Sequence, residues 1–334
     1  MPPTQPWSDD PALRAALALG LDLPVAPDAT RLANYLARAF GPATVALLHY
    51  GSHAQSAEAG PDSAWDFFVI VDDYLPAYRA LAAALPRGFP AGRGAFLNRI
   101  LPPNVISVTA PGAGDARLAK CCVLNQRDLA RACSTGPADH FVRARLFQQS
   151  HLVWARDAVG RERVTDAIAS ARWGTFAWGR PFLPARFDAR SYGRTLLAVS
   201  YAGEIRPEAA QHVDVLLDAQ GGTLMPMFGT LLAHLAARGA LVPIGDGYCD
   251  PRPPGAPARA LARAWFGWSK VRATLRWLKY VALYDDWLDY VVRKIERRSG
   301  VVLELTGRER RWPLIFLWPK ALRFITRRRG GRAS

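Results

Sequence analysis

Short hydrophobic runs alternate with helix-like stretches in the first half of the chain. Residues 28–40 place apolar side chains at helical spacing and end at a Gly-Pro pair, so they predict an amphipathic helix with Asp28 as its N-cap. Short apolar runs bounded by turn residues predict four strands, at residues 45–50, 66–73, 104–109 and 119–124. A further helix is expected around 77–85, and the remaining stretches between these strands are expected to be Gly/Pro-rich loops. This order predicts a mixed α/β unit over residues 28–157.

From residue 159 onward the pattern changes to helical repeats. Segments such as RERVTDAIASA, RSYGRTLLAVSYAGEI and MFGTLLAHLAARGA have the periodicity of helices and predict a mostly helical second domain over residues 158–250. The Pro-rich stretch 251–263 is expected to be a linker. Residues 264–334 follow as a Trp-rich, basic segment, and the chain contains no internal repeat.

Charge is concentrated at the C-terminal end. The 334-residue chain has a net charge of +15, and residues 261–334 alone hold 18 Lys and Arg against 6 Asp and Glu, a net of +12. Such a balance predicts attraction to a polyanion, which composition leaves open as nucleic acid, nucleotide phosphates or an anionic membrane surface. Half of the residues are hydrophobic, enough for a core in two or three units.

Several classes of protein are disfavoured by what the chain lacks. The cysteines have neither CxxC spacing nor nearby histidines, so they predict free buried thiols in a reducing compartment; they are Cys121, Cys122, Cys133 and Cys249. The N-terminal residues do not have the pattern of a secretory signal, and no apolar run reaches the length of a membrane span. We therefore expect a protein on the cytoplasmic side.

The candidate chemistry lies between two predicted strands. Gly51 and Ser52 follow the first strand, and Asp66 opens the second. A glycine there lets the backbone approach a triphosphate, while a serine and the N-terminal amides of a following helix donate hydrogen bonds to phosphate. A strand carboxylate can hold Mg²⁺, which neutralises charge during the displacement of pyrophosphate. The arrangement resembles that of a nucleotidyltransferase of the polymerase-beta type.

The metal site departs from the usual pair of aspartates. Ala64 stands where the first of the pair is expected, so Asp66 alone occupies the motif. Asp62, Asp72 and Asp73 are nearby alternatives that could supply further ligands or could be ordinary surface carboxylates.

Four later segments occur in a characteristic order. They are RLAKCCVLNQRDL (117–129), RARLFQQSHLVWARD (143–157), TLLAVSYAGEIRPE (195–208) and SKVRATLRWLK (269–279). With the YGS turn and the aspartate, they make residues 45–280 resemble the mitochondrial-type CDP-diacylglycerol synthases, the mitochondrial translocator assembly and maintenance family of phosphatidate cytidylyltransferases. The resemblance implies a winged-helix-like second domain, Mg²⁺ as cofactor, and CTP and phosphatidate as substrates.

The resemblance also assigns residues to the site. The family's YGS motif falls on Tyr50, Gly51 and Ser52, and its metal aspartate falls on Asp66. Its strand lysine and its second-domain motif fall on Lys120, Tyr201, Gly203, Glu204 and Arg206. On this basis Asp66, Ser52 and Lys120 are the expected catalytic residues, and Tyr50, Gly51, Tyr201 and Arg206 are expected to bind the nucleotide with them. Glu204 replaces an aspartate, Cys121-Cys122 a Tyr-Gly pair, and Gln148-Gln149 a Lys-Pro pair.

The resemblance also predicts a role for the basic C-terminal segment. Phosphatidate lies in a bilayer, so the enzyme must bind the membrane surface to reach it. Six of the eleven tryptophans are mixed with Arg and Lys there, as in an interfacial anchor, namely Trp265, Trp268, Trp277, Trp287, Trp312 and Trp318. The expected membrane-contact residues are Trp312, Phe316, Trp318, Arg327, Arg328 and Arg329. The alternative is that the tryptophans form a helical core.

Taken together, the sequence predicts a cytoplasmic enzyme, peripheral at the inner face of the membrane, that meets CTP, phosphatidate and an anionic membrane surface. No nucleic acid is expected as partner, although a winged-helix-like fold and a +12 segment also suit a nucleic-acid module. A second alternative keeps the nucleotidyltransferase fold but transfers the nucleotide to a protein, or has lost catalysis, as Ala64 in place of an aspartate suggests. His49 and His151 are expected to pack or to be solvated rather than to catalyse, because an ionised phosphate needs no general base.

Overall fold

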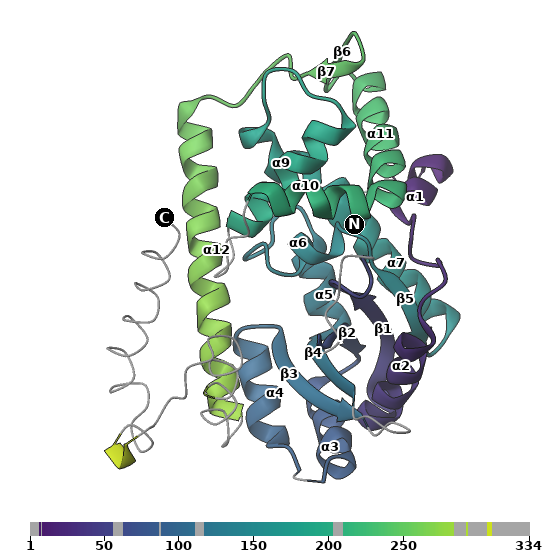
Figure 1. Ribbon diagram of the computed structural model, residues 1–334, viewed down its shortest axis with the longest axis vertical. Helices are drawn as coiled ribbons and strands as arrows, with labels where there is room; N and C mark the ends of the chain where they lie inside the picture. The colour runs from purple at the N-terminus through teal and green to yellow at the C-terminus, as the bar shows by residue number, and fades with distance from the viewer. Residues whose placement is uncertain are drawn as a thin grey trace, which may run out of the picture. The chain divides into compact units, whose positions relative to one another are not determined.

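The computed structural model describes residues 7, 9–55, 63–86, 88–110, 117–202, 210–283, 292 and 306–308. The chain divides into two compact units, Met1–Lys279 and Tyr280–Ser334. Both the predicted α/β domain and the predicted helical domain belong to the first unit, whose elements are shown in Figure 1. The prediction of a mixed α/β fold is confirmed.

A five-stranded mixed sheet forms one half of this unit, in the order β3-β4-β2-β1-β5. Its strands are β1 (Thr44–Tyr50), β2 (Trp65–Val71), β3 (Asn104–Ala110), β4 (Arg117–Asn125) and β5 (His151–Ala155). β2 and β4 pair in parallel, and the other neighbours are antiparallel. Every residue of β1 is buried, and so is every residue of β2 except Asp66, as expected for central strands covered on both faces.

Helices cover both faces of the sheet (Figure 1). One face carries α2 (Pro27–Phe40), α3 (Tyr74–Ala84) and α4 (Ala91–Ile100); the other carries α5 (Gln126–Cys133), α6 (Arg143–Leu146) and α7 (Ala158–Trp173). On the second face, which we call the α5–α7 face, alternate strand residues such as Leu48, Phe68 and Cys122 join one hydrophobic core with Leu129 and Ile168 from the helices. This face holds the candidate site at its edge.

Two local predictions for this half are corrected. Asp28 is not the N-cap of α2, because the helix already begins at Pro27, a residue suited to the first turn, and the Asp28 carboxylate pairs instead with Arg31 and Arg117. α4 was predicted as loop because its sequence, AGRGAFLNRI, holds two glycines. One of them, Gly94, is needed where the helix packs, since a Cβ there would lie 2.6 Å from the Phe89 ring.

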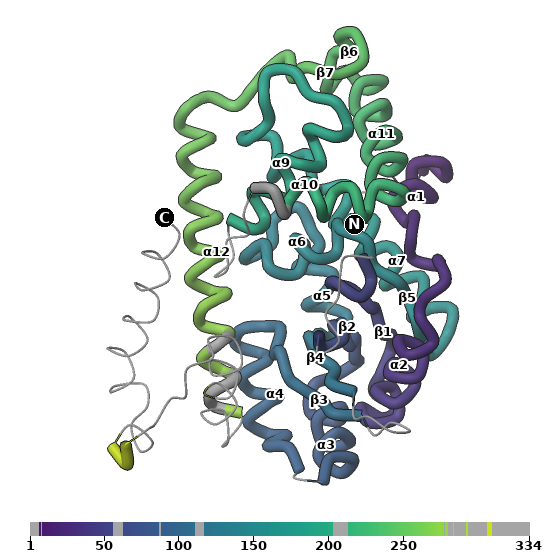
Figure 2. Tube along the Cα trace, viewed as in Figure 1, coloured from purple at the N-terminus to yellow at the C-terminus, as the bar shows by residue number. Residues whose placement is uncertain are grey.

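A second, helical half surrounds its own core. It contains α1 (Pro11–Leu17), α8 (Thr175–Gly179), α9 (Ala189–Ala202), α10 (Ala210–Ala219), α11 (Gly221–Ala237) and a hairpin of β6 (Val242–Ile244) and β7 (Gly247–Cys249). The N-terminal segment joins both halves, as the path of the tube from α1 to α2 shows (Figure 2). Buried Arg172 holds this segment by donating to the carbonyls of Leu17 and Leu19 at 2.8 and 2.7 Å.

α12 (Ala256–Leu283) starts inside the stretch 251–263 that was predicted as a linker. The prolines there do not prevent this, because Pro253 and Pro254 precede the helix and Pro257 lies in its first turn. Up to Lys279, α12 packs on the first unit. Lys279 donates from Nζ to the carbonyls of Leu101 and Pro103, which follow α4. The first part of the segment predicted to contact membrane is therefore also a structural element of the folded unit.

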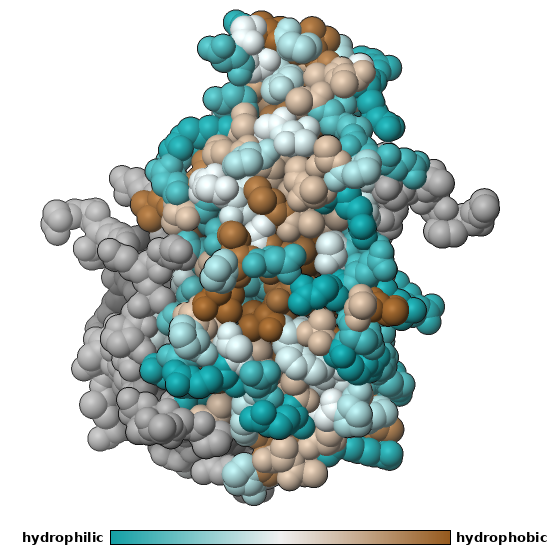
Figure 3. Space-filling model, turned by 90° about the vertical axis from the view of Figure 1, so that its right-hand side faces the viewer, coloured by the Kyte–Doolittle hydropathy of each residue, from teal (hydrophilic) through white to brown (hydrophobic). Residues whose placement is uncertain are grey.

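None of the helices in the described part of the chain is long and apolar enough to cross a membrane. Figure 3 shows the face on the side of α1, α2 and α7, where a small group of hydrophobic side chains is surrounded by hydrophilic ones. Such mixing is ordinary for a protein surface.

Candidate functional site

A row of polar positions crosses the end of the α5–α7 face. Tyr50 is paired with Asp66 across β1 and β2, Asp66 with Lys120 across β2 and β4, and Lys120 with Ser107 across β4 and β3. Directly paired residues point to the same face, on strands about 4.8 Å apart. Asp66, Lys120 and Ser107 are half-buried, whereas the next residues inward on β2 and β4, Phe68 and Cys122, are buried. The hydrophobic core of this face thus ends at a row of polar residues. In this row Asp66, with a carboxylate, and Lys120, with an ammonium group, are on neighbouring strands.

Gly51 brings the turn after β1 directly against this carboxylate. Its φ of +80° is in the left-handed region, and a Cβ added to it would lie 2.7 Å from Asp66 Oδ2. Both conditions demand glycine. The amides of Ala54 and Gln55 donate to the Gly51 carbonyl at 2.9 and 3.0 Å. A helix was expected to begin at Gly51 and Ser52. The structure instead has a turn over residues 51–55, which lies against Asp66 at Gly51.

Tyr50, at the β1 end of the row, is buried, whereas Asp66, Lys120 and Ser107 are half-buried. The residue is 7% exposed, and its hydroxyl lies 3.0 Å from Cys122 Sγ. Burial raises the pKa of Cys122 to about 11, a rise that the hydrogen bond from Tyr50 opposes, and burial also raises the pKa of Tyr50. Both groups are neutral at physiological pH, so Tyr50 forms part of the floor of the site. The sequence had suggested a nucleotide ligand at this position.

Arg145, which sequence reasoning did not single out, also belongs to this region. It is on α6 and donates to the Phe141 carbonyl at 2.8 Å while its guanidinium lies 3.9 Å from the Phe141 ring centre. Its positive charge acts on both Tyr50 and Cys122, opposing the larger effect of burial on their pKa values. The sequence feature that could have pointed to Arg145 is the stretch RARL, which belongs to one of the four segments that resemble the family.

α12 binds the segment that precedes α6 and Arg145 through ion pairs and a hydrogen bond. Asp139 is 7% exposed and accepts from Arg272 and Arg276 of α12 at 2.7 and 2.6 Å. Burial alone would raise the pKa of Asp139, but these two ion pairs and a backbone hydrogen bond outweigh it and keep the pKa below its usual value. The next residue, His140, donates from its backbone amide to Ser269 Oγ at 3.2 Å. The basic helix α12 therefore orders the approach to α6.

We expect Asp139→Asn to lower the free energy of unfolding by about 3 kcal/mol, because two arginines of a buried network lose their counter-charge. Asp214→Asn is the matched control, since Asp214 pairs with Arg194 at 2.8 Å on the surface. It should cost less than about 1 kcal/mol. Urea unfolding of both variants measures the difference. Equal losses would show that the Asp139 network contributes no more than a surface pair.

The remaining predicted site residues fall into three groups. Asp72 and Asp73 lie at the opposite end of β2 from Asp66, where Asp72 pairs with Arg156 and Asp73 caps α3. They are surface carboxylates and not ligands at this site. Tyr201 lies in the last turn of α9, next to Ser200. Outside the described residues lie Asp62, Gly203, Glu204, Arg206, Trp287, Trp312, Phe316, Trp318, Arg327, Arg328 and Arg329.

Two further expectations concern aromatic residues. His49 packs between Trp65 and Phe67, each 5.3 Å away by ring centres, and burial lowers its pKa to about 3. The prediction that His49 packs is confirmed. Trp265, proposed as an interfacial residue, instead packs against the helical core and lies 5.7 Å from the Arg143 guanidinium. Trp268 is 54% exposed.

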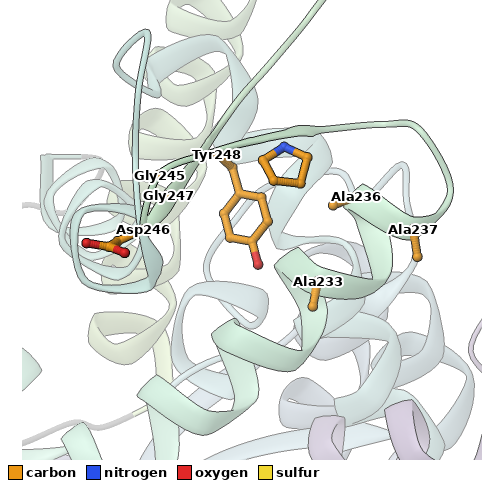
Figure 4. Close-up of a pocket in the computed structure, with 8 residues that line it drawn as sticks. Ala233, Ala236, Ala237, Gly245, Asp246, Gly247 and Tyr248 are labelled. Carbon is orange, nitrogen blue, oxygen red and sulfur yellow. The ribbon is translucent and has the colours of Figure 1, made fainter.

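Two surface cavities lie in the helical half and not at the sheet. One of about 400 Å³ is lined by Phe176, Arg180, Ala240 and Arg252. The other, of about 440 Å³, lies between the β6–β7 hairpin and α11, and Figure 4 shows the Tyr248 ring extending across it toward Ala233. Neither cavity is lined by a residue of the polar row. We therefore place the candidate site at the polar row and not at either cavity.

Comparison with known proteins adds no assignment. No protein-family model matches the chain, and no curated protein is significantly similar to it. The function is therefore argued from the residues and their geometry.

Proposed function

We propose that the protein is a Mg²⁺-dependent nucleotidyltransferase that makes CDP-diacylglycerol and pyrophosphate from CTP and phosphatidate. The observation that carries this proposal is the contact between Gly51 and Asp66, with Lys120 beside it on the parallel strand β4. A serine in a tight glycine turn, a carboxylate for a metal and a lysine for phosphate oxygens are three groups that nucleotidyl transfer can use. They lie together on one end of one sheet face.

The residues present fit Mg²⁺. Within the described residues there is no cluster of three or more His, Cys, Asp or Glu side chains that could hold a metal. Mg²⁺ does not require one, because it keeps several waters and binds through one or two carboxylates together with substrate phosphates. Asp66 would hold the ion, and Ala64 adds no ligand. The ion would neutralise negative charge on the triphosphate.

The protein's own groups then have distinct tasks. Lys120 and Arg145 attract the triphosphate, Lys120 as a point charge and Arg145 with a planar guanidinium. Ser52 donates to phosphate oxygens, while Tyr201 and Arg206 bind the nucleotide by analogy with the family that the motifs resemble. The attacking oxygen of phosphatidate is already ionised, so catalysis depends on position and charge and needs no general base.

The choice of CTP and phosphatidate rests on the order of the family-like segments. The same resemblance supports a polymerase-beta-like assignment for the sheet half and a winged-helix-like assignment for the helical half. An assay that offers each radiolabelled nucleoside triphosphate in turn, with Mg²⁺ and phosphatidate vesicles, tests the choice. We expect labelled lipid with CTP alone. Transfer to a protein or another acceptor, with none to lipid, would favour a nucleotidyltransferase of different specificity.

A lipid substrate requires contact with a bilayer, and α12 supports such contact. An apolar stripe at heptad-like spacing runs along its exposed side, with side chains between 42% and 73% exposed: Leu261, Trp268, Val271, Leu275 and Leu278. Arg263 and Lys270 are exposed on the same helix. An apolar stripe flanked by basic residues is typical of helices that lie on anionic membranes. The enzyme is proposed to act as a peripheral protein at the inner face of the membrane.

Removal of residues 308–334 should separate lipid contact from catalysis. The deletion removes nine basic residues and the LIFLW stretch, and each basic residue near an anionic surface contributes on the order of 1 kcal/mol to binding. The truncated protein should still bind CTP with Mg²⁺ but lose vesicle association and most activity on bilayer phosphatidate. It should keep activity on a short-chain, water-soluble phosphatidate. An equal loss on both substrates would place the segment in the catalytic fold.

A further inference from the structure

Three buried glutamine side chains meet behind the Gly51–Gln55 turn. Gln148 Oε1 accepts from Gln55 Nε2 at 3.1 Å and from Gln220 Nε2 at 3.4 Å. Gln55 and Gln148 are 6% and 5% exposed, and Gln220 is fully buried. With Gln149, these residues form what we call the glutamine cluster. It joins the turn after β1 to the segment before β5 and to the residue that precedes α11.

Gln149 makes the second connection of the cluster to the turn. Its Nε2 donates to the Ala54 carbonyl at 3.0 Å, and its backbone amide donates to Gln220 Oε1 at 2.9 Å. Thr223, in the first turn of α11, donates to Gln149 Oε1 at 3.3 Å. The turn is therefore held at two successive residues, and both attachments lead to the beginning of α11.

The cluster is anchored on its other side as well. Gln148 Nε2 donates to the Ala144 carbonyl in α6 at 2.7 Å, and Arg172 donates to the Gln148 carbonyl at 3.1 Å. An amide side chain is both donor and acceptor, so one Gln148 can hold three partners without bringing a charge. A buried polar network of this kind fixes one geometry, because any displaced amide would lose hydrogen bonds away from water.

We propose that the glutamine cluster sets the affinity for the nucleotide by holding the Gly51–Gln55 turn in its phosphate-binding shape. Gln148, Gln149 and Gln220 are thus positioning residues, and the helical half acts on the site through α11. Naming the nucleotide as the ligand rests on the proposed function, whereas the ordering of the turn does not.

Gln148→Met tests the proposal with little change of shape. It removes the acceptor shared by Gln55 and Gln220 and the donor to Ala144. We expect the amides of Ala54 and Gln55 to exchange hydrogen about tenfold faster, and KM for CTP to rise about tenfold, while KM for phosphatidate is unchanged. Hydrogen exchange followed by mass spectrometry and steady-state kinetics measure the two effects.

Tyr192→Phe is the matched control for stability. It also removes one buried hydrogen bond, from Tyr192 to Thr175 Oγ1 at 2.9 Å, but within the helical core. It should lower the melting temperature and leave KM for CTP and exchange in the turn as in the wild type. If Tyr192→Phe raised KM for CTP as much as Gln148→Met does, the effect would be one of general stability and the proposal would be overturned.

Gln220→Met provides the second variant, and it serves alone if Gln148→Met does not fold. Gln220 makes no direct hydrogen bond to the turn in the described network, so faster exchange at Ala54 and Gln55 in this variant supports transmission through the cluster. Unchanged exchange and unchanged KM in the variants that fold would overturn the proposal. Faster exchange in a protein whose wild type binds no nucleotide would support the ordering of the turn and contradict the proposed function instead.

Discussion

Asp66→Asn should abolish nucleotide transfer while the fold remains intact. The amide has nearly the shape of the carboxylate, but it lacks the negative charge that would hold Mg²⁺ next to the triphosphate, and Ala64 offers no replacement. Loss of the metal's stabilisation of transition-state charge should reduce kcat by about 100-fold or more. Initial rates with saturating CTP and Mg²⁺ measure the effect, and the melting temperature monitors the fold.

The control for this variant is a second aspartate next to the same strand, β2. Asp72 directly follows β2 at its opposite end, where it pairs with Arg156 at 2.5 Å on the surface. Asp72→Asn should therefore keep nearly full activity. If Asp66→Asn retained more than about a tenth of the wild-type rate, a loss under 1.4 kcal/mol, and still required Mg²⁺, Asp66 would not be the metal ligand.

Gly51→Ala should have an effect of similar size for a steric reason. The added Cβ would lie 2.7 Å from Asp66 Oδ2, so either the turn or the carboxylate must move. The left-handed backbone at φ +80° adds strain of about 1–2 kcal/mol for any residue with a Cβ. We expect both a loss of stability and a fall in kcat/KM for CTP of about 100-fold, because displacement by about 1 Å disturbs a preorganised site.

Gly88→Ala separates these two causes. Gly88 has a φ of +67°, but a Cβ there would meet nothing within 4 Å. The two variants should therefore share the loss of stability from backbone strain, measured by urea unfolding, and differ in activity. Full activity in Gly51→Ala would show that the close contact with Asp66 has no role in catalysis.

The sequence indicated the strands of the sheet more reliably than the helices around it. Continuous apolar runs predicted β1, β2 and β4 because central strands are buried on both faces and need no polar alternation. β3, which was also predicted, is an edge strand with alternating burial, and β5, at the other edge, was not predicted. α4 escaped prediction because its glycines weaken local helix propensity, while tertiary packing against Phe89 makes one of them necessary. Similarly, prolines suggested a linker at 251–263, although prolines before a helix and in its first turn are compatible with α12.

For the candidate site, the sequence supplied the residue types but not their neighbours. It paired Gly51 with Asp66 through a motif, and the family-like segments added Lys120. Arg145 and the glutamine cluster could not be found in this way, because their relation to the turn arises from contacts between segments distant in sequence. Tyr50 looked like a ligand because it adjoins Gly51, yet its side chain is buried in the core of the α5–α7 face, with its hydroxyl 3.0 Å from Cys122 Sγ.

The proposed reaction is the transfer of a cytidylyl group from CTP to a lipid phosphate. It is tested most directly by following two labels of CTP, one at the α-phosphorus and one at the γ-phosphorus, in separate reactions with phosphatidate vesicles and Mg²⁺. The α-label should enter the lipid fraction as CDP-diacylglycerol, and the γ-label should appear in pyrophosphate in equal amount. The appearance of γ-label in the lipid, or of neither label there, would contradict the account.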